Sequence, residues 1–197
     1  MAEMTDGTTT RLRSALGNIR SLADDMAQRS SFHVTFDDFH IMTADEIRDW
    51  RDIVREESGD TAYTLPPELV DIYRLTGGFD FRWTCDADAG PIAGAIVLSS
   101  LPELYQRDDE ADVPMKQSMT GWRRIDTISP DECTVLRLDG GAAALRCTYV
   151  RHEHHIPLNI SPTDYIISAA DHLGVAGWQT SDTTDKEKIV RELAEWQ

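Results

Sequence analysis

The chain has 197 residues, enough for one domain that buries roughly 70% of the surface of its unfolded form, so folding needs neither a disulfide nor a metal. Its 35 acidic and 19 basic residues give a formal net charge of −16, which repels phosphate backbones and argues against direct binding of nucleic acid. No apolar run approaches the roughly 20 residues of a membrane span, and the polar start lacks the pattern of a signal peptide.

The cysteines are Cys85, Cys133 and Cys147, an odd number without C-x-x-C spacing, in apolar contexts that suit reduced thiols in a core. We therefore expect a cytoplasmic protein without membrane contact. The acidic excess has two readings. It favours solubility in general, and it also suits a surface that steers a basic protein partner.

The first part of the chain predicts helices and one strand. Residues 1–10 are polar and Thr-rich, so we expect a disordered or variable start. Apolar residues at steps of three and four predict an amphipathic helix over 11–26. Residues 32–41 are typical of a strand, with Asp37 and Asp38 marking a turn. Thr43, followed three residues later by Glu46, predicts a capping box at the start of the next helix.

A proline start and a glycine stop bound the most informative segment, residues 65–79. Pro67 fits the first turn of a helix, and Gly77 or Gly78 can adopt the left-handed conformation that ends one. The alternating residues that follow predict a strand over 79–85, so the glycine pair indicates a corner between helix and strand.

Strands dominate the middle of the chain. A tight loop after residue 85 leads to a strand over 92–98 and one short helical turn over 101–105. The acidic run at 108–112 indicates a solvated loop. Segments 133–138 and 143–150 flank Asp139-Gly140-Gly141, which predicts a hairpin.

Two helices close the chain. Ser161 as cap and Pro162 at the first position predict a helix that ends at Gly174, and residues 183–196 have the pattern of another. Helices, then strands, then helices predict an α+β fold with a mixed or antiparallel sheet flanked by helices, as a single domain over 11–197.

The most metal-like cluster is the run from Arg151 to His155, with His172 further along. In an extended segment His152 and His154 share one face while His155 points away, and no second ligand pair completes a tetrahedron. We therefore favour a solvated strand end or a loop that contacts a partner.

Two other candidates for chemistry are weak. Asp86-x-Asp88-x-Gly90 resembles the opening of a calcium loop, but its glycine comes one position early and the twelfth-position glutamate is lacking, so it indicates a turn. Cys147 with His152 resembles a nucleophile and its base, but a cysteine in an alternating strand is usually a packed apolar residue. Phosphate-binding loops and serine-hydrolase elbows are absent. We expect no catalytic, cofactor-binding or metal site.

Taken in order, these elements resemble the SUKH superfamily of Smi/Knr-like domains. The resemblance rests on the segment LPPELVDIYRLTGGFDFRW, on the strand and helical turn at 92–105, on the later hairpin and on the helix that begins at Ser161. The family shows an Asn-Gly-Gly corner or a similar one, which Thr76-Gly77-Gly78 replaces here. The likeness covers roughly residues 45–175 and implies a SUKH-like α+β domain.

The resemblance implies binding rather than catalysis. Bacterial members are commonly immunity proteins that neutralise toxins, often nucleases or deaminases, while fungal relatives act in cell-wall regulation. Carboxylates that replace phosphates would suit the basic groove of such a toxin. The candidate partner-binding residues are Asp80, Asp86, Asp88, Asp108, Asp109, Glu110 and Asp112. A regulatory or scaffold module that binds a host protein is the alternative, and a small-molecule enzyme is a third reading.

Overall fold

Two antiparallel sheets form the centre of the protein. The computed structural model describes residues 5–58, 64–86, 91–105, 122–129, 131–138, 145–152, 154–175 and 177–180. Sheet A has the order β1-β2-β3 and contains β1 (Phe32–Asp38), β2 (Phe79–Cys85) and β3 (Ile92–Leu98). Sheet B has the order β4-β5-β6-β7 and contains β4 (Trp122–Ser129), β5 (Glu132–Arg137), β6 (Cys147–Arg151) and β7 (His154–Pro157). The sheets meet where Ser99 N, just after β3, donates to Ile125 O of β4 at 2.8 Å.

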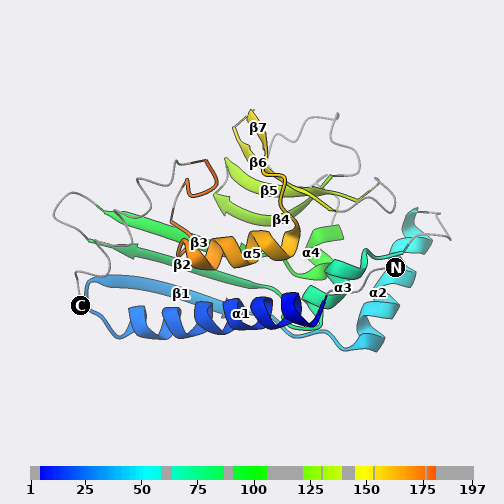
Figure 1. Cartoon of the computed structure of the whole chain (residues 1–197), viewed down its shortest axis with the longest axis horizontal. Helices are drawn as coiled ribbons and strands as arrows, with labels where there is room; N and C mark the ends of the chain where they lie inside the picture. Colours follow the sequence, from blue (N-terminus) through cyan, green and yellow to red (C-terminus); the bar gives the residue numbers. More distant parts are fainter. Residues whose placement is uncertain are drawn as a thin grey trace.

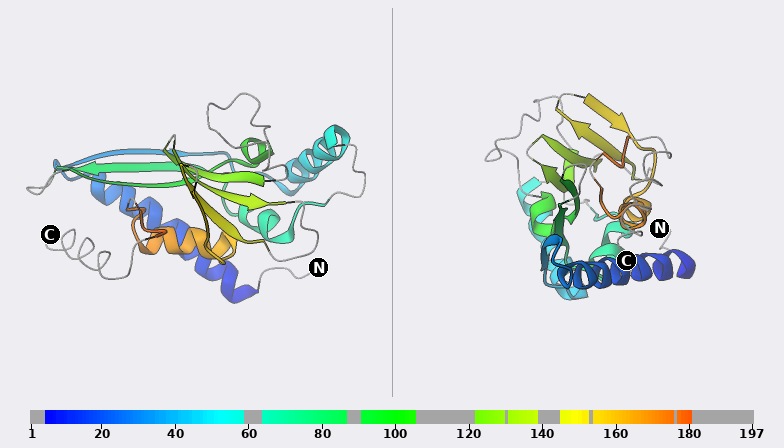
Figure 2. Two further views of the ribbon diagram at one scale, coloured as in Figure 1. Left: turned by 90° about the horizontal axis from the view of Figure 1, so that it is seen from above. Right: turned by 90° about the vertical axis from the view of Figure 1, so that its left-hand side faces the viewer.

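Helices cover one side of sheet A. Both α1 (Asp6–Ala27) and α5 (Pro162–Asp171) lie on that side, as Figure 1 and Figure 2 show. The β2 side chains alternate accordingly, with Phe79, Phe81, Trp83 and Cys85 buried on the helix side. The other helices, α2 (Ala44–Ser58), α3 (Pro67–Tyr73) and α4 (Leu101–Tyr105), lie toward one end of the molecule (Figure 1).

The local signals in the sequence predict these elements well. The α+β class with helices beside antiparallel sheets is confirmed, and the predicted bounds of β2 and β3 match the observed ones. In the capping box, Thr43 N donates to Glu46 Oε2 at 2.7 Å and Glu46 N donates to Thr43 Oγ1 at 3.3 Å. The bond from Thr43 N, and after it the bond that Thr43 Oγ1 donates to Glu46 Oε2 at 2.8 Å, lower the pKa of the Glu46 carboxyl. Ser161 Oγ caps α5 by accepting from Asp164 N.

Two expectations need correction, and one strand was missed. The expected variable start, residues 1–10, was too long, because α1 begins at Asp6 with Thr5 as its cap. The expected turn at Asp37 and Asp38 was wrong, since both residues pair with β2 and belong to β1. Strand β4 was not predicted. The turn at 139–141 and the helix predicted over 183–196 lie outside the described residues, although β5 and β6 do pair as expected.

Close packing explains the glycine pair after α3. The backbone at Phe39 and His40 passes directly over it, and a Cβ built on Gly77 would lie 1.8 Å from His40 O. Gly78 has a φ of 104°, in the left-handed region, and its carbonyl accepts from Phe39 N at 3.0 Å. The corner therefore fixes the end of α3, the start of β2 and the segment that leaves β1.

We expect Gly77→Ala to lower the free energy of unfolding by about 3 kcal/mol or more, because backbone atoms fill the space that its Cβ needs. The matched control is Gly17→Ala in α1, where a Cβ meets nothing within 4 Å and helix propensity predicts a gain of about 0.5–1 kcal/mol. Urea unfolding followed by tryptophan fluorescence measures both. Equal stability of the two variants would contradict this account of the corner.

Candidate interaction surface

The side of sheet A that faces away from α1 and α5 is here called the outer face. Alternation along the paired strands places the following side chains on it: His33, Thr35, Asp37, Asp80, Arg82, Thr84, Ala93, Ala95 and Val97. Most are polar or small, and those of β1 are all exposed. The outer face therefore carries mainly polar and small side chains in a strongly acidic protein.

The outer face brings two carboxylates together at one end. Asp37 of β1 lies directly opposite Asp80 of β2 in the strand register. Like charges opposite each other on a sheet are unfavourable. Arg82 relieves this pairing, because its Nε lies 2.8 Å from Asp80 Oδ1. Asp37 was missed as a candidate because its sequence context resembled a turn.

The predicted partner-binding residues do not form one cluster. Asp80 is half-buried near the start of β2, and Asp86 is exposed just beyond its end. Six residues of extended strand separate them by roughly 20 Å. The other predicted residues, Asp88, Asp108, Asp109, Glu110 and Asp112, lie outside the described residues.

Arg82 also connects the two sheets. Its Nη1 donates to Ile128 O at 2.6 Å and its Nη2 donates to Thr127 O at 2.8 Å, both on β4. The register places Arg82 opposite Ala95 of β3, whose small side chain lets the guanidinium reach across that strand. A planar fork with several fixed donors suits this task better than an ammonium group.

A buried polar network holds α5 against sheet B. The hydroxyl of Tyr165 donates to Asp126 Oδ2, and Thr134 N donates to Asp126 Oδ1 at 2.5 Å. The same hydroxyl accepts from Thr134 Oγ1 at 2.9 Å and from Gln179 Nε2 at 3.3 Å. The phenol thus uses its one donor and accepts two bonds, which is its full capacity.

Burial dominates the titration of this network. Removal from water raises the pKa of Asp126 to about 6, although the bonds from Tyr165 and Thr134 act in the opposite direction. Burial and the nearby Asp126 charge raise the pKa of Tyr165 well above its ordinary value. Asp126 and Tyr165 are only 1% and 3% exposed, so neither reaches a molecule at the surface. Their evident role is to position α5.

The histidine run lies at the exposed end of sheet B. His152 has a φ of 51° in the turn after β6, and His154 and His155 are exposed at neighbouring positions of β7, which point to opposite faces. His172 instead stacks on Trp178, with ring centroids 5.4 Å apart. Glu153 lies outside the described residues, and within the described ranges no three His, Cys, Asp or Glu side chains are placed to hold a metal ion.

The thiols are buried and free, as the sequence predicted. Burial raises the pKa of Cys147 well above its usual value and also raises the pKa of Cys85. Cys147 is fully buried whereas His152 is exposed, so the geometry does not favour a nucleophile and its base.

Comparison with protein-family models, curated proteins and solved structures gave no match for this chain. The chain is therefore characterised by its fold and its surface. It is an α+β domain with two antiparallel sheets, and α1 and α5 leave one polar face of sheet A uncovered (Figure 2). Among the described residues, no helix has both the length and the apolar character needed to cross a membrane.

We expect Arg82→Met to destabilise the protein by about 2–3 kcal/mol, because it removes charge-assisted bonds to two β4 carbonyls and leaves Asp80 facing Asp37. The apolar stem is retained, so the loss reports on the guanidinium. Arg74→Met is the matched control at an exposed position of the same residue type, with an expected change within about 0.5 kcal/mol. Similar unfolding midpoints for the two variants would refute the role of Arg82.

We expect Asp126→Asn to change how stability depends on pH. The folded pKa of about 6 lies above the ordinary 3.8, so the contribution of Asp126 is fully present below about pH 4 and is lost as the pH rises through 6. In the variant, the side chain at this position has no carboxyl group to ionise. Relative to the native protein, it should therefore gain about 2–3 kcal/mol between pH 4 and pH 7.

Denaturant unfolding at dilute protein concentration, at several pH values across that range, measures this difference. Asp24→Asn, at an exposed position of α1, controls for the loss of one carboxyl group. A constant stability difference between native protein and Asp126→Asn would show that Asp126 titrates normally.

Proposed function

We propose that the chain is a non-enzymatic protein-binding domain that neutralises a cognate bacterial toxin, of basic nuclease or deaminase type, by occupying its substrate groove. The observation that carries the proposal is the outer face of sheet A, a polar surface that α1 and α5 leave uncovered, with Asp37 and Asp80 on it and Asp86 just beyond β2, in a chain with a net charge of −16. The resemblance to immunity proteins of the SUKH superfamily supports it.

The mechanism is electrostatic replacement. A groove that binds nucleic acid is lined with lysine and arginine, and carboxylates can take the positions of phosphates there. The field of the whole acidic protein speeds the encounter, while the local carboxylates fix the orientation. The outer face has short side chains at Thr35, Thr84 and Ala93, so a partner can approach its strands closely.

The first experiment is recovery of the tagged protein from its native cells at low and moderate salt, with identification of stoichiometric partners. A basic nuclease or deaminase that loses its activity at equimolar dose would support the proposal. A bound host protein that stays active would favour the regulatory or scaffold alternative. If repeated trials give no partner, including trials with toxins expressed, the proposal fails.

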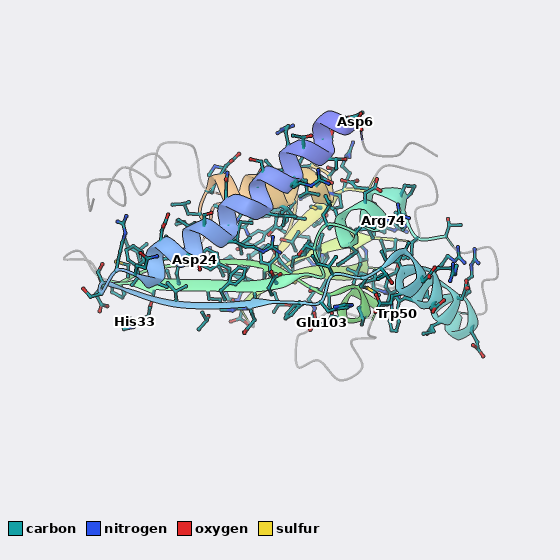
Figure 3. All side chains as sticks on the ribbon, turned by 90° about the horizontal axis from the view of Figure 1, so that it is seen from below. Asp6, Asp24, His33, Trp50, Arg74 and Glu103 are labelled. Atoms are coloured by element: carbon teal, nitrogen blue, oxygen red, sulfur yellow. The ribbon has the colours of Figure 1, made fainter. Side chains whose placement is uncertain are left out.

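We expect charge reversal on the outer face to slow association with that partner. Asp86→Lys should reduce the association rate constant by about three- to tenfold at low salt, because Asp86 is exposed beside the proposed contact. Asp24→Lys makes the same change in net charge on α1, which lies on the opposite side of sheet A (Figure 3). Stopped-flow or surface-binding kinetics compare the two. Equal rates for both variants would exclude the outer face around Asp86.

A further inference from the structure

Strand β1 is an edge of sheet A, and its pairing shows which backbone groups point outward. Ser31 O accepts from Asp86 N at 3.3 Å, and Gly78 O accepts from Phe39 N at 3.0 Å. Along an antiparallel ladder, hydrogen-bonded pairs alternate with pairs that are not hydrogen-bonded. The backbone N–H and C=O groups of His33, Thr35 and Asp37 therefore point toward β2 and bond to it.

The N–H and C=O groups of Val34 and Phe36 consequently point away from β2. Within the described part of the chain, they have no hydrogen-bond partner. Seen from below, β1 runs along the rim of sheet A, where Figure 3 labels His33 near one end. Unpaired edges of this kind are templates for another strand.

The side chains of β1 are complementary to themselves about Thr35. If a second β1 pairs antiparallel with Thr35 opposite Thr35, then His33 lies opposite Asp37 of the second copy, and Val34 lies opposite Phe36. Val34 and Phe36 are the two half-buried apolar side chains of this strand. Imidazole with carboxylate, Thr with Thr, and aliphatic with aromatic are favourable cross-strand pairs.

The backbone agrees with this register. It sets Val34 opposite Phe36 of the other copy twice, and both residues have outward-pointing groups. Two such pairs supply about four main-chain hydrogen bonds. If the register shifted by one residue, backbone groups that point outward in one copy would lie opposite residues whose groups point inward in the other. The backbone and the side chains therefore select the same alignment.

We propose that two copies of this chain associate through antiparallel pairing of their β1 strands about a two-fold axis at Thr35. The pairing joins the two three-stranded sheets into one continuous sheet and places both outer faces on it. Pairing of identical edges is isologous, so it closes at two copies and leaves no further free β1 edge.

Net charge opposes this dimer at long range, since each copy carries −16. Added salt screens that repulsion, whereas the backbone bonds of the interface change little. We therefore expect the dimer to tighten as NaCl rises from about 0.05 M to about 0.5 M. Binding of a basic toxin should weaken over the same range, so the two proposals respond oppositely to salt and can fail independently.

Sedimentation equilibrium of the full chain, at protein concentrations from about 1 to about 500 µM, tests the dimer. Val34→Pro removes an outward N–H that β2 does not use and should raise the dimer dissociation constant at least about tenfold. Val34→Thr keeps the N–H and the branched shape, so the dimer should persist. A strictly monomeric native protein, or equal dissociation constants for both variants, would overturn the proposal.

Charge exchange provides a test that does not depend on the proline. His33→Asp and Asp37→Lys should each weaken the dimer by about tenfold, because each sets like charges or mismatched groups opposite one another twice. The double variant restores an opposite-charge pair at both places and should recover the dimer. Circular dichroism confirms that each variant is folded. Failure of the double variant to recover association, while folded, would exclude this register.

Discussion

The contact between Tyr165 and Asp126 is the constraint on which the two-sheet arrangement depends. Helix α5 carries Tyr165, and the carboxylate it meets belongs to β4. The start of α5 is held independently, since Glu68 Oε1 of α3 accepts from Thr163 N at 3.0 Å. Its far end rests on sheet A, where Gly174 O accepts from Ala95 N at 2.8 Å. One short helix thus connects α3, sheet A and sheet B.

Polar rather than apolar contacts make this connection, so it contributes more to orientation than to stability. A buried carboxylate is weak evidence for added stability, because desolvation offsets much of the gain from its bonds. Its bonds are directional, however, and within the described ranges Asp126 accepts from donors that β5 and α5 place. Together with Arg82, whose side chain lies on the outer face, the network fixes the angle between the sheets. A surface held rigid in this way loses little conformational entropy when a partner binds.

Local signals in the sequence predicted the local structure, but they did not predict pairings between residues that are far apart in the sequence. The caps at Thr43 and Ser161 depend on residues three positions away, so the sequence displays them directly. Strand β4 escaped prediction because charged residues interrupt its apolar pattern. Asp126, a buried polar residue in that strand, has partners 8 and 39 residues away. Asp37 resembled a turn residue for a similar reason, since its β2 neighbour Asp80 is distant in the sequence.

The proposed dimer and the proposed partner complex are linked through charge, and each favours formation of the other. Repulsion between two copies of −16 limits pairing of β1, and a basic partner bound to the outer face removes part of that repulsion. Partner binding would therefore strengthen dimer formation. By reciprocity, the dimer would bind the partner more tightly than the monomer does, by the same factor. Asp37 lies on both surfaces, so a partner that engages its carboxylate directly competes with His33 of the second copy and reduces this coupling.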